Sequence, residues 1–309
     1  MHELALLAVL VAALALAWLA QWRRKHRLLR SIERLTLALR ATNSAELRPL
    51  GPLAGAPRET RLLLAALDGA FARVRDFVAS EKRFVTTVAH ELRTPLAAIR
   101  AHAQLAAGSG SAAETGASLA AILRDIDRAS RLIEQLLDLA RVEALPGESL
   151  HWSCVALEDV LREALHDLSR NASRKDVRLH ADLQAKQMTG LGYCVELMVR
   201  NLLSNSIQYC GIGGEVKIAS RAERDGVALV IDDSGPGIPA AERLSAFEPF
   251  NRLGRSGNDG VGLGLAIVLR IVELHKASIR LSQGPLGGLR VELWFPCSPA
   301  ARGAGTEQA

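Results

Sequence analysis

The chain has 309 residues, enough for two or three modules, and its wealth of Ala, Leu and Arg with only 4% aromatic residues favours helices. The net charge is +5, but no basic patch is interleaved with aromatic side chains, which argues against a nucleic-acid partner. Cys154, Cys194, Cys210 and Cys297 form no CxxC pair and no zinc-like spacing with histidine, so they are predicted to be free thiols.

The N-terminus carries an apolar run without a charged residue, over residues 4–20, which is near the lower length limit of about 17 residues for a membrane span. Trp18 and Trp22 end the run, and basic residues follow at once, as expected for the headgroup level and the cytoplasmic side. We therefore predict a single-pass anchor over 1–22 that holds the protein to membrane lipid, with everything after Trp22 in the cytoplasm and no domain on the outer side. The alternative is a cleaved signal peptide, whose positive charge should precede the apolar run.

Two short helical patterns follow, separated by a Pro- and Gly-rich connector from Pro49 to Pro57. Their apolar residues recur every three or four positions, which favours pairing in a parallel dimer because neither helix can bury its stripe alone. The alternative is a pair of ordinary linker helices. With Glu59 opening the second helix, the segment 23–77 resembles a HAMP linker. The two stripes are Leu28, Ile32, Leu35, Leu39 and then Leu63, Leu67, Ala70, Val74, Phe77.

A clearer helical hairpin is predicted over residues 78–145, with its turn at Gly108–Gly110. Each helix has an apolar stripe whose gaps suit left-handed bundle packing. Two helices are too few for a stable bundle, so we expect a homodimer in which two antiparallel hairpins form a four-helix bundle. The stripes are Val85, Val88, Leu92, Leu96, Ile99 and then Leu119, Ile122, Ile126, Ala129, Ile133, Leu136, Ala140.

From about residue 150 the pattern changes to alternating strands and helices, which predicts an α+β sandwich over 150–297 with one mixed sheet under helices. The tail over 298–309 is rich in Ala and Gly and is predicted to be disordered. The strands are expected near 177–183, 216–218, 227–231, 278–282 and 289–295, and the helices near 157–170, 191–209 and 261–275.

The first chemical motif is the run His-Glu-Leu-Arg-Thr-Pro-Leu from His90 to Leu96. His90 is two residues from the stripe positions on either side, about 200° around the helix, so its ring points away from the seam. A neutral imidazole facing water is a good nucleophile near neutral pH. Glu91 can accept the other ring N–H, and Pro95 should bend the helix one turn later. Taken alone, an exposed histidine on a helix usually has no function.

The second motif is the pair Asn201 and Asn205, which are four residues apart and so share one helix face. Side-chain carbonyl oxygens suit Mg²⁺, which takes oxygen ligands and keeps several waters. The alternative is an ordinary solvated face.

The third motif, Asp233-Ser-Gly-Pro-Gly237, follows the strand predicted over 227–231. Its carboxylate can accept a hydrogen bond from the adenine amino group, while Gly235 and Gly237 allow backbone to approach the ring. The alternative is a tight turn after a strand.

The fourth motif is Gly260-Val-Gly-Leu-Gly-Leu265, which opens a predicted helix and would expose N–H groups to phosphates. The glycine spacing differs from a dinucleotide fingerprint, and no strand precedes it. The polar segment between the third and fourth motifs, which includes Phe247 to Arg252, is long enough to form a mobile lid over a nucleotide.

In order, these motifs resemble those of the sensor histidine kinases of bacterial two-component systems, from about residue 18 onward and most strongly over 84–96 and 201–265. The resemblance implies ATP- and Mg²⁺-dependent autophosphorylation of a histidine and phosphotransfer to an aspartate of a response regulator receiver domain, with dephosphorylation of that regulator as a further activity. The implied residues are catalytic His90, Glu91 and Thr94; ATP-binding Asn201, Asn205, Tyr209, Asp233, Gly235, Gly237, Phe250, Arg252, Gly260, Gly262, Leu263 and Gly264; and the Mg²⁺ ligands Asn201 and Asn205.

The resemblance also implies individual roles. His90 would accept the phosphate with the help of Glu91, and Thr94 would serve dephosphorylation of the partner. Asp233 would bind adenine, and Arg252 would reach the γ-phosphate.

Two positions depart from the family pattern. Gln208 stands where a cation is frequent, and Asn251 where an aromatic is common. A non-catalytic scaffold that binds ATP poorly therefore stays an alternative, as does another ATPase of the same nucleotide-binding superfamily, which would not need His90 or its hairpin.

Overall fold

The computed structural model describes residues 58–145, 152–254 and 260–297, together with scattered positions between 14 and 36. The chain divides into two compact units, residues 1–86 and 87–309. Most of the predicted anchor, the first linker helix, the connector at 49–57 and the tail at 298–309 lie outside the described residues. None of the helices among the described residues is both long enough and apolar enough to cross a membrane.

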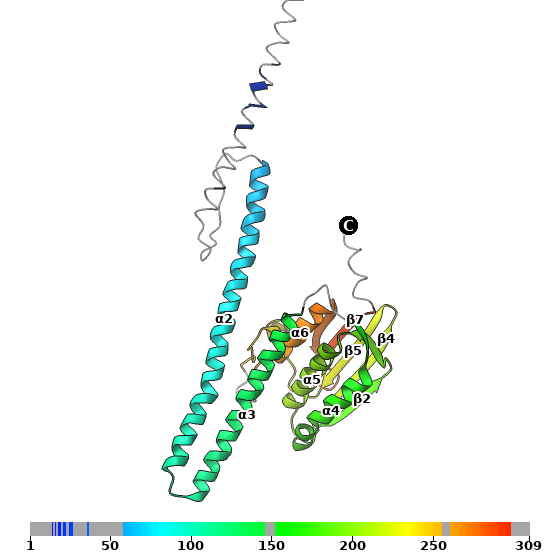
Figure 1. The fold of residues 1–309 in the computed structure, drawn as a ribbon. Coiled ribbons are helices and arrows are strands. Elements are labelled where there is room, and N and C mark those ends of the chain that lie inside the picture. Colours follow the sequence, from blue (N-terminus) through cyan, green and yellow to red (C-terminus); the bar gives the residue numbers. More distant parts are fainter. Residues whose placement is uncertain are drawn as a thin grey trace, which may run out of the picture. The chain divides into compact units, whose positions relative to one another are not determined.

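Two long helices form the predicted hairpin, α2 (Arg58–Gly108) and α3 (Ala112–Glu143). The break falls at the predicted Gly-Ser-Gly turn, where the Ser109 hydroxyl donates to the Glu114 carboxylate at 2.8 Å. α2 continues without interruption past residue 78, where the boundary between linker and hairpin was predicted, and through Pro95. Its C-terminal part and α3 run antiparallel (Figure 1).

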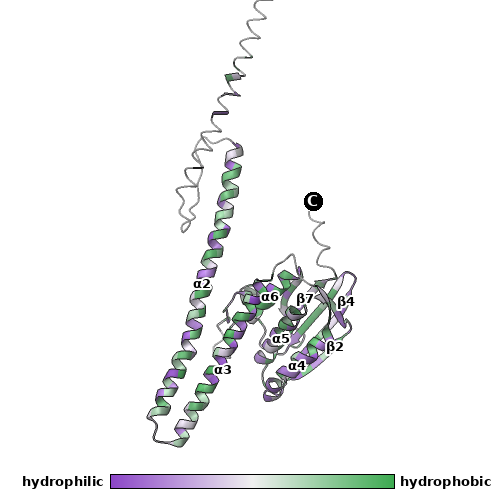
Figure 2. Ribbon diagram, in the orientation of Figure 1, coloured by the Kyte–Doolittle hydropathy of each residue, from purple (hydrophilic) through white to green (hydrophobic). Residues whose placement is uncertain are grey.

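About half of the residues in the predicted apolar stripes of the hairpin are exposed in a single chain, and the others are partly buried. Val85 and Leu96 on α2 are each 59% exposed, and on α3 Leu119, Ile126 and Ile133 are 52%, 43% and 47% exposed. Figure 2 shows apolar residues along both helices. These residues are available to pack against a partner.

The C-terminal part is the predicted α+β sandwich. Its five-stranded sheet has the order β2-β4-β5-β7-β6, in which β2 and β4 are parallel and all other neighbours antiparallel. α4, α5 and α6 cover one face of the sheet (Figure 1). The bounds are β2 (Arg178–Leu183), β4 (Glu215–Glu223), β5 (Gly226–Asp233), β6 (Ser278–Gln283), β7 (Leu289–Pro296), α4 (Leu157–Arg174), α5 (Gly192–Tyr209) and α6 (Gly264–Leu274).

Alternation of buried and more exposed residues along β4 and most of β7 places the core between sheet and helices. In β7, Val291, Leu293 and Phe295 are at most 3% exposed, while the residues between them face the other side of the sheet. Met198 of α5 and Ile267 of α6 are fully buried against this face. A second, two-stranded antiparallel sheet of β1 (Ser153–Ala156) and β3 (Gln187–Gly190) was not predicted from the sequence. The last helix was predicted to begin at 261 but begins at Gly264, because the positive φ of +81° at Gly262 is not helical.

His275 ties the end of α6 to the beginning of α5. Its Nε2 accepts a hydrogen bond from the Leu191 N–H at 3.1 Å, so Nδ1 carries the proton and donates to the Ile271 carbonyl at 2.8 Å. Trp152 and Phe295 meet the ring edge-on, at centroid distances of 5.0 and 5.7 Å. Burial lowers the pKa of this histidine, although the hydrogen bond to Ile271 acts in the opposite sense. The neutral ring thus holds in place the helix that carries both asparagines.

Candidate active site

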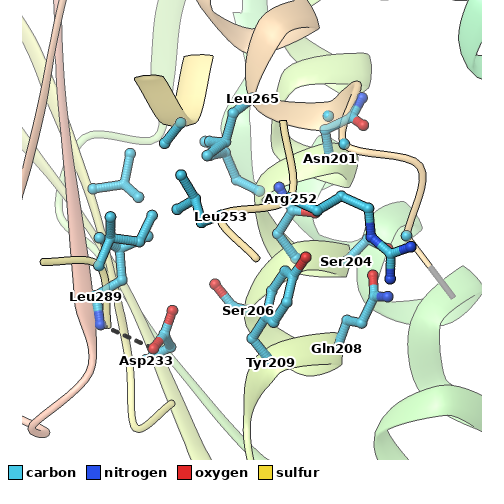
Figure 3. A pocket seen from close by; sticks show the side chains of 18 of the residues that line it. Asn201, Ser204, Ser206, Gln208, Tyr209, Asp233, Arg252, Leu253, Leu265 and Leu289 are labelled. Atoms are coloured by element: carbon cyan, nitrogen blue, oxygen red, sulfur yellow. Dashed lines mark hydrogen bonds between the residues drawn. The ribbon is translucent and has the colours of Figure 1, made fainter. Parts of the chain in front are cut away.

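A cavity with about 950 Å³ of empty space, partly open to solvent, lies where the described segments that carry the motifs meet. Its mixture of apolar and polar walls suits a nucleotide. α5, the loop after β5, the segment before α6 and the first turn of α6 surround it (Figure 3). Of the predicted residues, Asn201, Asn205, Tyr209, Asp233, Gly237, Arg252, Gly260, Gly262 and Gly264 line it.

Asp233, at the end of β5, is fixed at one side of the cavity. The residue is 5% exposed, and its Oδ1 accepts hydrogen bonds from the backbone N–H of Gly235 at 2.9 Å and of Leu289 at 3.0 Å (Figure 3). These bonds hold the carboxylate in one orientation. A buried carboxylate with a fixed direction can select a ligand that presents an amino group, as adenine does.

Gly235 does not line the cavity, and its role differs from the predicted approach to a ring. A Cβ at Gly235 would lie 3.0 Å from the Tyr209 carbonyl oxygen, so glycine allows the loop to pack closely against the end of α5. Gly237 has a φ of +63° and lies against Gly288. The glycines of this motif therefore shape the loop.

Asn201 and Asn205 face the beginning of α6. Asn201 is 8% exposed and its Nδ2 donates to the Leu197 carbonyl at 2.8 Å, so the interpretation of this face as merely solvated is wrong at Asn201. A Cβ at Gly264 would lie 3.1 Å from the Asn201 Oδ1 and 3.1 Å from the Asn205 Nδ2. A larger residue there would have to displace the two amides by a few tenths of an ångström.

The chemistry of this amide pair fits Mg²⁺. The Asn201 amide nitrogen is occupied within α5, and its oxygen points to where the N-terminus of α6 would attract phosphates. Neutral oxygen ligands, with water and phosphate completing the shell, are typical of Mg²⁺ in nucleotide sites. In the described part of the chain, no group of three or more His, Cys, Asp or Glu residues could hold a metal ion alone. A cation here would thus depend on the phosphates of a bound nucleotide.

The lid segment and the glycine motif are joined through their backbones. The Phe250 N–H donates to the Gly262 carbonyl at 2.9 Å, and a Cβ at Gly262 would lie 2.9 Å from the Phe250 carbonyl carbon. Phe250 and Leu263 were predicted to bind ATP, but neither lines the cavity, and Leu263 is fully buried beneath α6. These two residues hold the glycine motif in place and do not face the cavity.

The structure shows what surrounds the side chains at the two departures from the family pattern. The Asn251 Nδ2 donates to the Ser245 carbonyl at 2.8 Å, and its Oδ1 accepts from the Leu253 N–H at 3.0 Å, so this residue fastens the lid segment. Gln208 lines the cavity, and its Nε2 would lie 3.1 Å from a Cβ at Gly260. The side chain of Arg252 lies on the α5 side of the same cavity (Figure 3).

Several lining residues were not predicted. Ile238, Ala246, Leu289 and Val291 supply the apolar walls, and only the two residues of β7 left a signal, as alternate positions of a predicted strand. Gln135 lines the cavity from α3 of the hairpin, which no motif indicated.

The predicted phosphoacceptor lies on a different element. His90 is exposed on α2, as expected from its position relative to the stripe, and Glu91 is half-buried beside it. The Thr94 hydroxyl donates to the His90 carbonyl at 3.2 Å, one helical turn away. None of these three residues lines the cavity, so the described structure holds a candidate nucleophile and a candidate nucleotide site on separate elements.

The fold and the site together define a histidine-bearing hairpin followed by a nucleotide-binding domain, and comparison with known proteins agrees. Residues 80–145 match the His Kinase A (phospho-acceptor) domain family, and residues 193–299 match the histidine kinase-, DNA gyrase B- and HSP90-like ATPase family. The first match sets the chain apart from the other ATPases of this superfamily.

Individual proteins extend these matches. The sensor protein kinase PmrB of Pseudomonas aeruginosa is 36% identical over 83% of this chain, which spans 56% of that protein's length. The sensor protein CutS of Streptomyces coelicolor is 31% identical over a match that covers 95% of this chain and 70% of CutS. The solved structure of the histidine kinase AdeS from Acinetobacter baumannii superposes with a TM-score of 0.54 at 25% identity, covering 68% of this chain and 98% of AdeS. The chain belongs to the sensor histidine kinases of bacterial two-component systems.

Proposed function

We propose that this protein transfers the γ-phosphate of ATP to its own His90 and then to an aspartate of a response regulator receiver domain. The observation that carries the proposal is the presence, in the same chain, of an exposed histidine on α2 and a cavity lined by the residues of the Asn201, Asp233 and Gly260 motifs. In the first step the ring nitrogen forms a bond to phosphorus, the bond between the γ-phosphorus and the bridging oxygen breaks, and ADP leaves. Glu91 accepts the proton of the other ring nitrogen.

The cavity residues take the remaining roles in the proposal. Asp233 accepts from the adenine amino group, and the start of α6 with Gly262 and Gly264 faces the phosphates. Asn201 and Asn205 hold Mg²⁺, which would screen the charge of the triphosphate. Arg252 lines the cavity and supplies the cation for the γ-phosphate.

The assembly is proposed to be a homodimer in which the open stripes of two hairpins cover each other. Stripe residues that are 43–59% exposed in one chain support this arrangement. The predicted anchor over 1–22 would hold the dimer at the bacterial inner membrane, with the HAMP-like segment 23–77 between the anchor and the hairpin.

The decisive experiment is labelling with γ-³²P-ATP of the full chain, purified in mild detergent. The wild type should gain phosphate that is labile in acid and stable in alkali, and His90→Gln should gain none. His102→Gln, on the same helix, is the matched control and should label like the wild type. A wild type without label, or equal label on His90→Gln, contradicts the proposal, and absence of label in the wild type would favour a scaffold.

Dephosphorylation of the regulator is a second candidate activity, and the exposed Thr94 hydroxyl one turn after His90 favours it. Thr94→Ala should leave autophosphorylation unchanged and slow the loss of phosphate from a phosphorylated receiver domain several-fold. Thr86→Ala is the control, because the Thr86 hydroxyl donates to the Lys82 carbonyl at 2.8 Å in the same way. Normal dephosphorylation by Thr94→Ala would rule out this role.

A further inference from the structure

The hairpin contributes a polar side chain to the nucleotide cavity. Gln135 of α3 lines the cavity together with residues of α5, α6 and β7. Its Oε1 is shielded from solvent and accepts no hydrogen bond from any residue that the structure describes. A buried acceptor without a hydrogen-bond donor costs free energy, so this oxygen favours a ligand that brings a donor.

A polar contact one turn further along α3 holds the hairpin against the catalytic domain. Asp138 is 9% exposed and accepts from the Tyr193 hydroxyl at 2.8 Å and from the Arg200 Nη2 at 3.2 Å. Burial raises the pKa of the Tyr193 phenol, which therefore stays protonated and can donate. We call these three residues the α3–α5 clasp.

Asp138 of the clasp and Gln135 lie three residues apart on α3. Residues three apart lie on one face of a helix, so fixing Asp138 to α5 also fixes the direction of Gln135. α3 also packs against α6, whose first residues line the cavity. α3 therefore contacts both α5 and α6, and both of these helices line the cavity.

The position of Gln135 along the hairpin also agrees with a role in phosphotransfer. Counted outward from the turn between α2 and α3, His90 is level with Ser130. Gln135 lies about 8 Å further along the helix axis, one and a half turns away. The cavity thus meets the hairpin near the level of the histidine.

Building on the proposed function, we infer that Gln135 is a nucleotide-site residue supplied by the hairpin, and that the α3–α5 clasp positions it to accept a hydrogen bond from an O–H group of the bound Mg²⁺-nucleotide. A ribose hydroxyl and a metal-bound water are the two O–H donors that such a ligand brings. Nucleotide contact with both α3 and the catalytic domain would link nucleotide binding to docking of the domain on the hairpin.

Calorimetric titration of the full chain with a non-hydrolysable ATP analogue and Mg²⁺ tests the inference. Gln135→Leu should weaken binding about 3- to 10-fold, the range for one lost neutral hydrogen bond. Glu134→Ala, at the exposed neighbouring position, should bind like the wild type. Equal affinity of Gln135→Leu and the wild type overturns the inference and leaves the proposed function standing, whereas a wild type that binds no nucleotide overturns both.

The clasp is tested by Tyr193→Phe, which removes only the hydroxyl donor to Asp138. We expect weaker nucleotide binding in this variant, and no additional loss when it is combined with Gln135→Leu, because both changes remove the same contact. A purely structural effect would add to Gln135→Leu instead. Tighter binding in Tyr193→Phe would mean that α3 shields the cavity, and would also overturn the inference.

Two further titrations distinguish the donors. If a ribose hydroxyl donates, Gln135→Leu and the wild type should bind a 2′,3′-dideoxy analogue equally well. If a metal-bound water donates, the difference should disappear in EDTA and persist with the dideoxy analogue. A difference that survives both changes excludes an O–H donor and overturns the assignment.

Discussion

The hairpin and the catalytic domain differ in where their functional residues come from, since the first takes them from one helix and the second from several elements. On the hairpin, His90, Glu91 and Thr94 lie within five consecutive residues of one helix, and His90 and Thr94 are exposed. In the catalytic domain the candidate site is assembled from α5, α6, two strands and the lid segment, and Asn201 and Asp233 are at most 8% exposed. Reactivity in the first region depends on local sequence, and in the second on the packing of the whole domain.

This difference has consequences for substitution. A change on the exposed hairpin surface should alter chemistry or assembly without altering the stability of the catalytic domain. A change at a buried position of the domain should affect the site and the stability together, unless it preserves shape. The predictions below test this contrast, from the largest expected effect to the smallest.

The largest effect is expected at Asn205. Asn205→Asp keeps the size of the side chain but places a negative charge beside the start of α6, where the triphosphate would bind. Like charges at this range oppose binding by several kcal/mol at an effective dielectric constant of about 20. Autophosphorylation should fall by about 100-fold or more, with thermal unfolding within a few degrees of the wild type. Asn171→Asp, exposed on α4, is the control and should keep full activity.

His275 should show the next largest effect, on stability. His275→Ala removes a buried ring and leaves the Leu191 N–H without its acceptor, so unfolding should become easier by about 3 kcal/mol. Denaturant unfolding at pH 7.5 measures this loss. His166→Ala, exposed on α4, should change stability by less than about 0.5 kcal/mol. A small loss in His275→Ala would mean that the two helices are not tied through this ring.

The same histidine predicts a pH dependence. Its pKa is lowered in the folded protein, so below the unfolded value of about 6.5 the unfolded chain binds more protons than the folded one. The contribution of His275 to stability should be complete above that pH and decline as the pH falls toward the folded pKa. The difference in unfolding free energy between the wild type and His275→Ala should therefore be smaller at pH 5.5 than at pH 7.5. A constant difference across this range would contradict the prediction.

On the hairpin, Ile126→Glu should disrupt the dimer and leave the catalytic domain intact. The side chain lies in the predicted stripe and is 43% exposed in one chain, so it has no fixed environment until a partner covers it. Sedimentation should show a shift to monomer at micromolar concentrations, with nucleotide binding unchanged. Arg124→Glu, exposed on α3 and outside the stripe, should remain dimeric. A dimeric Ile126→Glu would place the interface elsewhere.

The smallest effect is expected at Lys175, which follows α4. Its ammonium donates to the carbonyls of Ile207, Gln208 and Cys210 at the end of α5, where Gln208 and Tyr209 line the cavity. Lys175→Met should loosen this helix end and raise the KM for ATP about 2- to 5-fold, with little change in kcat. Lys175→Arg should recover most of the loss. A change in kcat alone would point to a different role.

Local sequence was sufficient for features that depend on periodicity and short motifs. The stripes gave the two hairpin helices and their turn, and the exposed position of His90 followed from its angle to the stripe. Alternation identified all five strands of the main sheet, although β4 proved longer than its three predicted residues. Nine of the twelve predicted nucleotide-site residues line one cavity, because their motifs occupy the ends of α5 and β5 and the start of α6.

Only the tertiary structure decided what depends on contacts between distant segments. The place of Leu263 in the core and that of Phe250 behind the glycine motif came from packing and a positive φ at Phe250 and Gly262, which no periodicity records. The pairing of β1 with β3 joins strands more than thirty residues apart, both too short to give a pattern. The contributions of Gln135, Asp138 and His275 likewise exist only once α3, α5 and α6 are packed together, since each of these side chains acts on a segment remote from it in the chain.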